Sequence, residues 1–560
     1  MAPNIAVLAT TALLAFTTAV GAISKVSRTG RYLYTADGNR FFIKGIAYQT
    51  QGTRLVVSGP DNPLNQPSTF VDQLADSAGC TRDLPVFQKL GVNAIRAYSV
   101  DSSLNHDSCM SALSGAGIYV IVDLTLPLNG SIDTTQPAWS TNLQDQYIKT
   151  INAFSKYDNV LAYNVGNEVL TADATNAAPF IKAAARDIKA YLTSISSSAL
   201  VGYAAIDGAS NFRDPVANYL SCDPSGTNSG SSSIDIFGLN NYEWCGDAPT
   251  TTYDGINAEF ADYNVVAYFS EFGSENCSPG TRVWTEVATL FSSPMTNVWS
   301  GGLAFSYFPA ESAGHQFGMA TLSSDNTTVT TNADFDNLVL QYGKVSFVNS
   351  PAQSAASASS FSACPTANAS FAASSMLPPT PNDVECACIE NALSCQFHPS
   401  TPDFNVVVGT LTGTACGLLG AGGCVDISAN GTTGVYGRLA FCDPSTKLSY
   451  AFSEYYESQN RQATACSFNG NGTVNAAAPT GSGAALSAAT SCIANPSAVS
   501  TPSASGGSGS GSGTGSSSGS GSSSSGNKSG AVAVFGAQNA LFGLGLMAAC
   551  MVGSALWTLA

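Results

Sequence analysis

The stretch Val160-Leu161-Ala162-Tyr163-Asn164-Val165-Gly166-Asn167-Glu168 decides the fold, because it is an apolar run that ends in a glutamate. A second run of similar design, residues 265–269, is followed by Ser270-Glu271-Phe272-Gly273. Runs that are apolar throughout, without alternation, indicate strands buried on both faces of a parallel sheet. The two glutamates therefore lie at the carboxyl ends of two buried strands.

Six further apolar runs have the same strand-like character. Helical patterns at 143–154, 177–192 and 282–291 lie between some of them, and this alternation predicts an α/β fold of the (β/α)8 TIM barrel type. Glu168 then follows the fourth strand and Glu271 the seventh. The alternative is a doubly wound open sheet, but no glycine-rich nucleotide-binding loop supports it. The six other predicted strands are 41–48, 93–98, 118–124, 200–206, 234–239 and 298–307.

Two carboxyl groups at the mouth of a barrel have a specific chemical use. The carboxyl ends of barrel strands surround the active site, and a retaining glycosidase needs a nucleophile and an acid/base about 5–5.5 Å apart there. An asparagine before the acid/base, as in Asn167-Glu168, holds the sugar 2-hydroxyl. The pattern indicates a carbohydrate-active enzyme. A buried salt bridge is the structural alternative for each glutamate, and Glu243, Glu275 and Glu311 compete for a carboxylate role.

Composition excludes some classes of partner. The chain has 560 residues, 44% of them hydrophobic, which is enough for more than one domain. Lys and Arg number 21 against 38 Asp and Glu, so the formal net charge is −17. Nucleic-acid binding requires a basic surface, so we expect no nucleic-acid partner. Only 11% of the residues are charged, which suits a glycosylated extracellular protein.

Both ends of the chain carry targeting patterns. Residues 1–22 have the apolar stretch and small-residue end of a signal peptide, with cleavage after Ala22. A Ser/Gly-rich tail, 494–530, cannot form a packed core and is predicted to be disordered. Residues 531–560 then provide the apolar end of a GPI-anchor signal, with Asn527 as the attachment residue and Ser529 and Gly530 as neighbouring candidates. A single membrane-spanning helix is the alternative for the apolar end.

Cysteine usage agrees with export. Of 15 cysteines, Cys550 falls in the segment that anchoring would remove, and the remaining 14 suffice for seven disulfides. The three histidines have no zinc-site spacing, so we expect neither a metal nor an organic cofactor. Candidate glycosylation triplets begin at Asn129, Asn276, Asn326, Asn368, Asn430, Asn471 and Asn527.

A second, smaller domain follows the predicted barrel of residues 23–349. Residues 350–381 are rich in Ser, Ala and Pro and read as a connector. Eight cysteines then lie within 382–493, which predicts a small module that depends on disulfides. Its aromatic run 450–456 suits either a sugar-stacking platform or core packing.

Seven motifs in order along residues 23–345 resemble fungal cell-wall β-1,3-glucanosyltransferases of glycoside hydrolase family 72. The cysteine-rich part resembles the family 43 carbohydrate-binding module found in one branch of that family. The motifs are 41–49 (FFIKGIAYQ), 96–101 (RAYSVD), 119–124 (YVIVDL), 163–168 (YNVGNE), 240–246 (NNYEWCG), 270–273 (SEFG) and 305–308 (FSYF).

The resemblance implies a role for each matching residue. Glu168 matches the family's acid/base and Glu271 its nucleophile. The catalytic-domain cysteines would pair Cys80 with Cys109, Cys222 with Cys364 and Cys245 with Cys277, whereas the pairing of the module cysteines stays open. Residues expected to line the glucan cleft are Gln49, Tyr98, Asp123, Asn167, Tyr242 and Tyr307.

The resemblance also implies the reaction and its location. We expect a retaining transglycosylase that cleaves an internal β-1,3-glucan linkage and joins the new reducing end to the non-reducing end of another chain. The partners would be donor and acceptor glucan chains and a GPI lipid at the outer face of the plasma membrane and cell wall, with the protein a monomer. Two alternatives remain: a β-1,3-glucanase with the same two glutamates, and a glucan-binding wall protein without activity.

Overall fold

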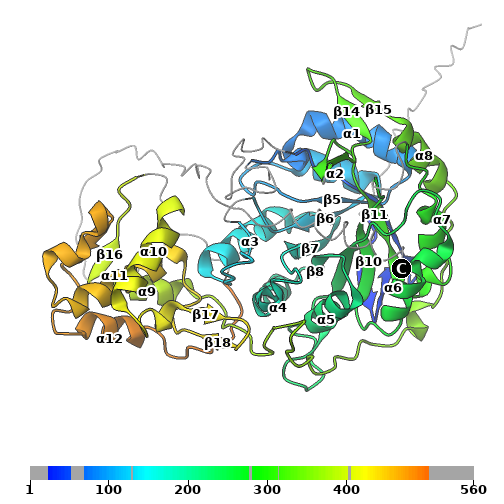
Figure 1. The fold of residues 1–560 in the computed structure, drawn as a ribbon. Helices are drawn as coiled ribbons and strands as arrows, with labels where there is room; N and C mark the ends of the chain where they lie inside the picture. The colour runs from blue at the N-terminus through cyan, green and yellow to red at the C-terminus, as the bar shows by residue number, and fades with distance from the viewer. Residues whose placement is uncertain are drawn as a thin grey trace, which may run out of the picture.

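The computed structural model describes residues 23–51, 69–127, 130–275, 281–312, 314–401 and 405–503, in a large barrel domain and a smaller helical module (Figure 1). The predicted signal peptide, the Ser/Gly-rich tail beyond residue 503, Asn527, the apolar C-terminal segment and Cys277 lie outside the described residues. Within the described ranges, no helix combines the length and the apolar character needed to cross a membrane.

Eight parallel strands close into a barrel in the order β10-β11-β4-β5-β6-β7-β8-β9. Closure is made where β11 pairs with β4, with Gly301 opposite Ile43, so the predicted barrel is confirmed and the open-sheet alternative is wrong. The strands are β4 (Ile43–Ala47), β5 (Ala94–Ala97), β6 (Tyr119–Asp123), β7 (Val160–Asn167), β8 (Leu200–Ile206), β9 (Ile236–Asn240), β10 (Val266–Phe272) and β11 (Trp299–Ala304).

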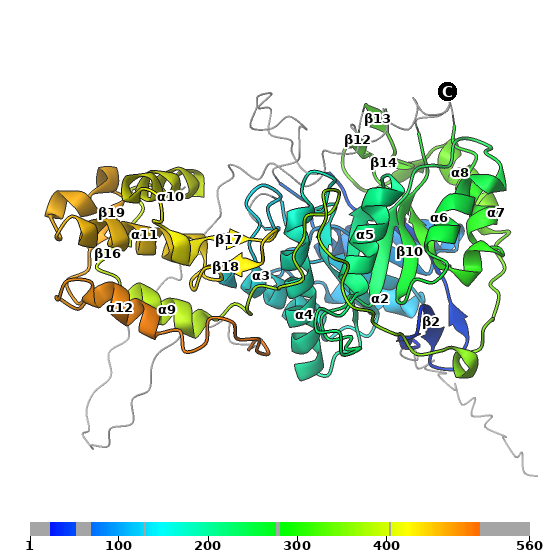
Figure 2. The same cartoon turned by 60° about the horizontal axis from the view of Figure 1, so that its bottom comes forward.

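Helices surround this barrel, as Figures 1 and 2 show from two directions. The predicted helix at 282–291 is wrong at its start: α7 begins only at Glu286, because Trp284 has a φ of 55° and Arg282 is tied to Asp334 through its N–H and guanidinium. The barrel helices are α1 (Ser77–Leu90), α2 (Asp107–Gly115), α3 (Thr141–Phe154), α4 (Ala178–Ser194), α5 (Ser210–Ser221), α6 (Asp254–Glu259), α7 (Glu286–Leu290) and α8 (Ala333–Tyr342).

A short antiparallel sheet precedes the first barrel strand, and two short hairpins follow the last one. The antiparallel sheet of β1, β2 and β3 contributes Val26, Leu33 and Phe41 to the apolar cluster that fills the barrel interior. Two hairpins, β12-β13 and β14-β15, follow β11. Their bounds are β1 (Val26–Thr29), β2 (Tyr32–Thr35), β3 (Arg40–Phe41), β12 (Glu311–Ser312), β13 (His315–Gln316), β14 (Ala320–Leu322) and β15 (Val329–Thr331), and the 3-10 helices of this domain and its connector are η1 (Gln73–Ala75), η2 (Thr175–Ala177), η3 (Thr250–Tyr253), η4 (Met295–Asn297) and η5 (Gln353–Ala355).

The module is mainly helical and held by four disulfides, Cys386–Cys442, Cys388–Cys492, Cys395–Cys466 and Cys416–Cys424. These bonds answer the pairing question that the sequence left open. The module elements are α9 (Asp383–Ala392), β16 (Cys395–Phe397), α10 (Asn405–Leu419), η6 (Val425–Ile427), β17 (Ala429–Asn430), β18 (Val435–Tyr436), α11 (Pro444–Ser458), η7 (Ala463–Cys466), η8 (Phe468–Gly470), β19 (Gly472–Val474) and α12 (Ala484–Ser491).

The aromatic run on α11 serves mainly to pack the module. Tyr450, Phe452 and Tyr456 are buried, and Phe452 stacks on Phe468 with ring centroids 3.6 Å apart. Of the two interpretations that the sequence allowed for this run, core packing is the one that these contacts favour.

Of the candidate glycosylation sites within the described residues, Asn471 is the buried one. Its side-chain NH₂ group donates to the carbonyl of Phe468 and its oxygen accepts from Ser400, so the folded module disfavours a glycan there. Asn326, Asn368 and Asn430 are exposed. The remaining three candidates, Asn129, Asn276 and Asn527, lie outside the described residues.

The module packs against the part of the barrel that follows Glu168. The ring of Tyr436 on β18 meets Phe180 on α4 edge to face at 5.7 Å. Gly431, in the β17-β18 turn, lies so close to η2 that a Cβ there would sit 1.9 Å from the carbonyl oxygen of Asn176. Only glycine permits this approach.

We expect Gly431→Ala to loosen the contact between module and barrel, because the added methyl group overlaps backbone. Limited proteolysis at the connector 350–381 should then proceed faster than in the parent protein. The matched control is Gly409→Ala on α10, where a Cβ meets nothing within 4 Å. Equal cleavage of Gly431→Ala and Gly409→Ala would contradict the close contact.

Candidate active site

Glu168 ends β7 in an unusual backbone conformation. Its φ is 53°, a left-handed value that costs a non-glycine residue about 1–3 kcal/mol. A register shift in the β7-β8 pairing precedes it, between Asn164 and Asn167, and its N–H donates to the carbonyl of Ala204. Irregularities of this kind at strand ends redirect side chains. Gly166 permits the arrangement, because a Cβ there would lie 2.9 Å from the ring of Tyr203.

Glu271 lies within β10, opposite Asn240 of β9 in the strand register. A register shift again precedes it. Gly273 follows with a φ of 112°, and a Cβ there would lie 2.3 Å from the ring of Trp284. The glycines of the two motifs are therefore required by close packing, and both glutamates are buried at the carboxyl ends of their strands, 4% and 1% exposed respectively.

The surroundings of the two carboxyl groups differ in their hydrogen-bond donors. One oxygen of Glu271 accepts from the hydroxyl of Tyr98 at 2.8 Å and from Arg96 at 3.3 Å. Its other oxygen accepts from the hydroxyl of Tyr242 at 2.7 Å. By contrast, Glu168 accepts from one side-chain donor, the NH₂ group of Asn240 at 2.7 Å, and its Oε2 has no hydrogen-bond partner among the described residues.

This difference assigns the protonation states. Burial raises the pKa of Glu168 to about 8, and the negative charge of Glu271 adds to the rise, which Asn240 and Arg96 oppose. Burial also raises the pKa of Glu271, but Arg96 and the hydroxyls of Tyr242 and Tyr98 oppose that rise, because they stabilise its ionised form. At neutral pH the proton therefore resides on Glu168, and Glu271 is the group better able to stay ionised.

Arg96 is the residue that joins the site together, and sequence reasoning did not single it out. It lies on β5, is fully buried, and donates to Asp123 at 2.6 Å, to Asn167 at 2.7 Å and to Glu271 at 3.3 Å. Its guanidinium also lies 4.2 Å from the ring centre of Tyr98. The available signal was a charged residue in the otherwise apolar strand Ala94–Ala97.

Two other sequence-predicted residues, Asp123 and Gln49, hold this network in place. Asp123 is buried, with its oxygens on Arg96 and on the NH₂ group of Asn164, so it positions Arg96. The oxygen of Gln49 accepts from the backbone N–H groups of Tyr98 and Ser99, and so fixes the residue that contacts Glu271.

Among the described residues, the side chain of Asn167 forms hydrogen bonds through its oxygen alone. That oxygen accepts from Arg96 at 2.7 Å and from Asn240 at 3.3 Å. Its NH₂ group is therefore the donor that remains for a ligand at the mouth.

An aromatic residue that sequence reasoning did not assign to the site lies between the two tyrosines. Phe305 follows β11 and meets Tyr98 and Tyr242 edge to face, with ring centroids 6.3 and 6.4 Å apart. All three rings are partly exposed. Aromatic faces of this kind suit the apolar faces of sugar rings. The signal for Phe305 was its position directly after the eighth barrel strand.

Tyr307 does not join this group, contrary to the expectation that it lines the cleft. Its side chain is fully buried, and its hydroxyl donates to Asp83 of α1 at 3.0 Å. Tyr48 donates to the other oxygen of Asp83 at 2.8 Å. Phe305 faces the two tyrosines, whereas Tyr307, two residues further on, contacts Asp83 of α1.

The three glutamates that competed for a carboxylate role have different surroundings: two lie beside arginines and one is exposed. Glu243 lies 3.5 Å from Arg213, in a cluster with Asp207, and burial raises its pKa to about 7. Glu275 pairs with Arg282 at 2.9 Å. Glu311 is exposed on β12. Arg96, Tyr98 and Tyr242 instead place their donors on Glu271.

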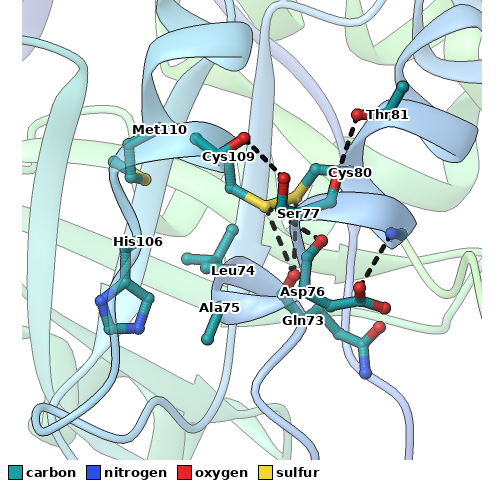
Figure 3. Close-up of a disulfide and its surroundings, with 12 residues drawn as sticks. Gln73, Leu74, Ala75, Asp76, Ser77, Cys80, Thr81, His106, Cys109 and Met110 are labelled. Carbon is teal, nitrogen blue, oxygen red and sulfur yellow. Dashed lines mark hydrogen bonds between the residues drawn. A yellow bond between two sulfur atoms is a disulfide. The ribbon is translucent and has the colours of Figure 1, made fainter.

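Disulfides link elements of the barrel domain outside the site. Cys80 and Cys109 join α1 to α2, beside the segment that carries Asp76 and near His106 (Figure 3). His106 lies 2.8 Å from Asp72, which also accepts from the N–H of Asp101 and so ties down the loop after β5. The structure also pairs Cys222 with Cys364, and Cys245 is disulfide-bonded. Its expected partner Cys277 lies outside the described residues.

No metal site accompanies these carboxyl groups in the described part of the chain: no group of three or more His, Cys, Asp or Glu residues there is placed to hold an ion. The chemistry that the arrangement supports uses two carboxyl groups of opposite protonation state, at the mouth of a parallel barrel. Two carboxyl groups placed in this way are the equipment of a glycoside hydrolase-type enzyme.

Comparison with known proteins identifies the family. Residues 14–346 match the glucanosyltransferase family of glycoside hydrolase family 72, and residues 393–473 match the X8 domain. The 1,3-beta-glucanosyltransferase gas1 of Schizosaccharomyces pombe is 37% identical over 487 residues, which are 85% of this chain and 84% of that protein. The chain therefore belongs to the glucanosyltransferase family.

Two further relatives come from Saccharomyces cerevisiae. The 1,3-beta-glucanosyltransferase GAS2 is 36% identical over 76% of this chain and 75% of that protein. A solved structure of Gas2p in complex with laminaritetraose and laminaripentaose superposes with a TM-score of 0.71 at 32% identity, covering 82% of this chain and 97% of that one. The barrel and the module thus have a solved counterpart.

The electrostatic coupling between the two glutamates can be tested by titration. We expect Glu271→Gln to lower the pKa of Glu168 below its value of about 8, because a neighbouring negative charge disappears. Infrared or NMR titration of ¹³C-labelled glutamate, with the Glu168 signal assigned from Glu168→Gln, measures the change. Glu311→Gln is the control and should leave the signal unmoved. A pKa for Glu168 that stays the same or rises in Glu271→Gln would show that the two groups do not interact.

Proposed function

We propose that the protein is a retaining β-1,3-glucanosyltransferase, which cleaves an internal β-1,3-glucan linkage and transfers the new reducing end to the non-reducing end of another glucan chain. The observation that carries the proposal is the pair Glu168 and Glu271, buried at one barrel mouth, with three side-chain donors on Glu271 and one on Glu168. Family membership and relatives named as 1,3-beta-glucanosyltransferases support the substrate and the reaction.

In the first step Glu271 attacks the anomeric carbon of the donor. Arg96, Tyr98 and Tyr242 hold both of its oxygens, so the attacking carboxylate is oriented before the substrate arrives. Glu168, protonated near neutral pH, gives its proton to the departing glucan. The NH₂ group of Asn167 holds the sugar 2-hydroxyl, a contact that strengthens in the transition state.

In the second step Glu168, now ionised, removes a proton from the hydroxyl of an acceptor glucan. That hydroxyl displaces Glu271 from the anomeric carbon and forms the new linkage. Transfer requires that the acceptor outcompete water, which positioning by sugar subsites and exclusion of water achieve. Phe305, between Tyr98 and Tyr242, offers an apolar surface for a sugar ring beside the glutamates.

A β-1,3-glucanase would use the same two residues, and only the products distinguish it. Incubation with a single laminari-oligosaccharide, followed by mass spectrometry, should yield products longer than the substrate. Exclusively shorter products would identify a hydrolase. If no product forms with intact Glu168 and Glu271, the protein acts only as a glucan-binding wall protein.

The domain boundaries and location form part of the proposal. We assign the signal peptide to 1–22, the catalytic barrel to 23–349, the connector to 350–381, the module to 382–493, the linker to 494–530 and the anchor signal to 531–560. The disulfides support an oxidising extracellular location, and GPI attachment at Asn527 to the outer face of the plasma membrane rests on the sequence pattern. A binding role of the module for glucan, and a monomeric state, belong to the same proposal.

Glu168→Gln and Glu271→Gln should each lower the transfer rate about a thousandfold or more, because the acid/base and the nucleophile are removed in turn. The exposed Glu311→Gln serves as a matched control and should retain the parent rate. Transfer is measured by product length, and binding of laminari-oligosaccharide by calorimetry should persist in both inactive variants. Normal turnover in either variant would refute the assignment.

A further inference from the structure

Three buried side chains from three barrel strands form a continuous hydrogen-bonded line behind the acid/base. The hydroxyl of Ser270 on β10 donates to the side-chain oxygen of Asn240 on β9 at 2.7 Å. The NH₂ group of Asn240 donates to Oε1 of Glu168 at 2.7 Å. Ser270, Asn240 and Glu168 are 0%, 2% and 4% exposed, so water does not substitute for these contacts.

We propose that Ser270 and Asn240 are positioning residues for the acid/base, which act together to make Oε2 of Glu168 the atom that carries the transferred proton. The inference rests on the proposed function, because it concerns the same catalytic group. Nothing in the family comparison or in the sequence motifs assigns a role to Ser270.

The orientation of the Asn240 amide follows from chemistry that allows one arrangement. Arginine only donates hydrogen bonds, so the atom of Asn167 that meets Arg96 at 2.7 Å is its oxygen. Asn240 meets the same oxygen at 3.3 Å, and therefore presents its NH₂ group there and to Glu168. The oxygen of Asn240 is left facing Ser270, whose hydroxyl donates to it.

This orientation determines which oxygen of Glu168 holds the proton. The NH₂ group of Asn240 donates to Oε1, so a proton on Oε1 would be repelled by the N–H hydrogen of Asn240. The proton is accordingly placed on Oε2, which is buried and has no hydrogen-bond partner within the described residues. A buried polar atom without a partner is costly in the free protein. Binding of a glycosidic oxygen would supply the missing partner.

The line also links the acid/base to the strand of the nucleophile. Ser270 directly precedes Glu271, and Asn240 is the register partner of Glu271 on the neighbouring strand. A shift of β10 would therefore move Glu271 and, through Ser270 and Asn240, the carboxyl group of Glu168. The separation of the two catalytic groups is kept by hydrogen bonds as well as by the barrel backbone.

The test compares Ser270→Ala, Asn240→Ala and the double variant by the pH dependence of kcat/KM for a laminari-oligosaccharide donor. Loss of activity at high pH reports ionisation of Glu168. The amide of Asn240 stabilises the ionised form of Glu168, so its loss raises the pKa of Glu168. The high-pH limb of the profile, where activity falls, then moves to higher pH. Ser270→Ala removes the hydrogen bond that polarises the Asn240 amide, which weakens the donation from its NH₂ group to Glu168 and shifts the limb in the same direction. We expect about half to one pH unit for each, the equivalent of one ordinary hydrogen bond.

Ser300→Ala is the matched control, since Ser300 is an equally buried serine on the adjacent strand β11 whose hydroxyl has no hydrogen-bond partner in the described structure. It should leave the pH profile in place. Because Ser270 acts through Asn240, adding Ser270→Ala to Asn240→Ala should not move the high-pH limb further. The rate of the double variant should stay within twofold of the rate of Asn240→Ala. Thermal unfolding of each variant checks that the barrel is intact.

The inference is overturned if Ser270→Ala leaves the high-pH limb in place. It is also overturned if Ser270→Ala lowers the rate equally in the parent and in Asn240→Ala. Either result would indicate that Ser270 acts on Glu271 alone. Failure of the proposed function has a separate signature. In that event the parent protein gives no product longer than the substrate, or Glu168→Gln keeps its turnover, whereas failure of the positioning line leaves parent transfer intact, Glu168→Gln inactive and the Ser270→Ala profile unchanged.

Discussion

The buried guanidinium of Arg96 is the interaction on which the site depends. A charge in the interior of a barrel is costly to desolvate and persists only where its partners are complete. Here Asp123, Glu271 and Asn167 supply those partners from three other strands, β6, β10 and β7. Removing Arg96 would leave two buried carboxylates without a cation. The same contacts fix the positions of Glu271 and Asn167.

The asymmetry between the two glutamates follows from this arrangement. Glu271 receives the guanidinium and two tyrosine hydroxyls, whereas Glu168 receives one amide and keeps an unpartnered oxygen. Two similar residues at one barrel mouth thereby acquire opposite roles. Backbone strain contributes to the same end, because the left-handed φ of Glu168 directs its side chain away from the ordinary course of β7.

Much of the fold was predictable, and the reasons for the misses are physical. Buried parallel strands are apolar throughout, so all eight were recognisable. Arg96 escaped because its partners are distant in sequence. Tyr307 was assigned to the cleft from its motif, but its hydroxyl donates to Asp83 of α1, a partner distant in sequence. The module disulfides could not be derived, since eight cysteines allow 105 pairings.

Trapping the covalent intermediate tests the central claim most directly, which is that Glu271 is the ionised nucleophile held by Arg96 and two tyrosines. A 2-deoxy-2-fluoro laminari-oligosaccharide with a good leaving group slows release of the glycosyl-enzyme, and peptide mapping by mass spectrometry then locates the ester. The account predicts a single labelled peptide, with the sugar on Glu271. A label on Glu168, Glu243 or Glu275, or a protein that turns over the substrate without any ester, would contradict it.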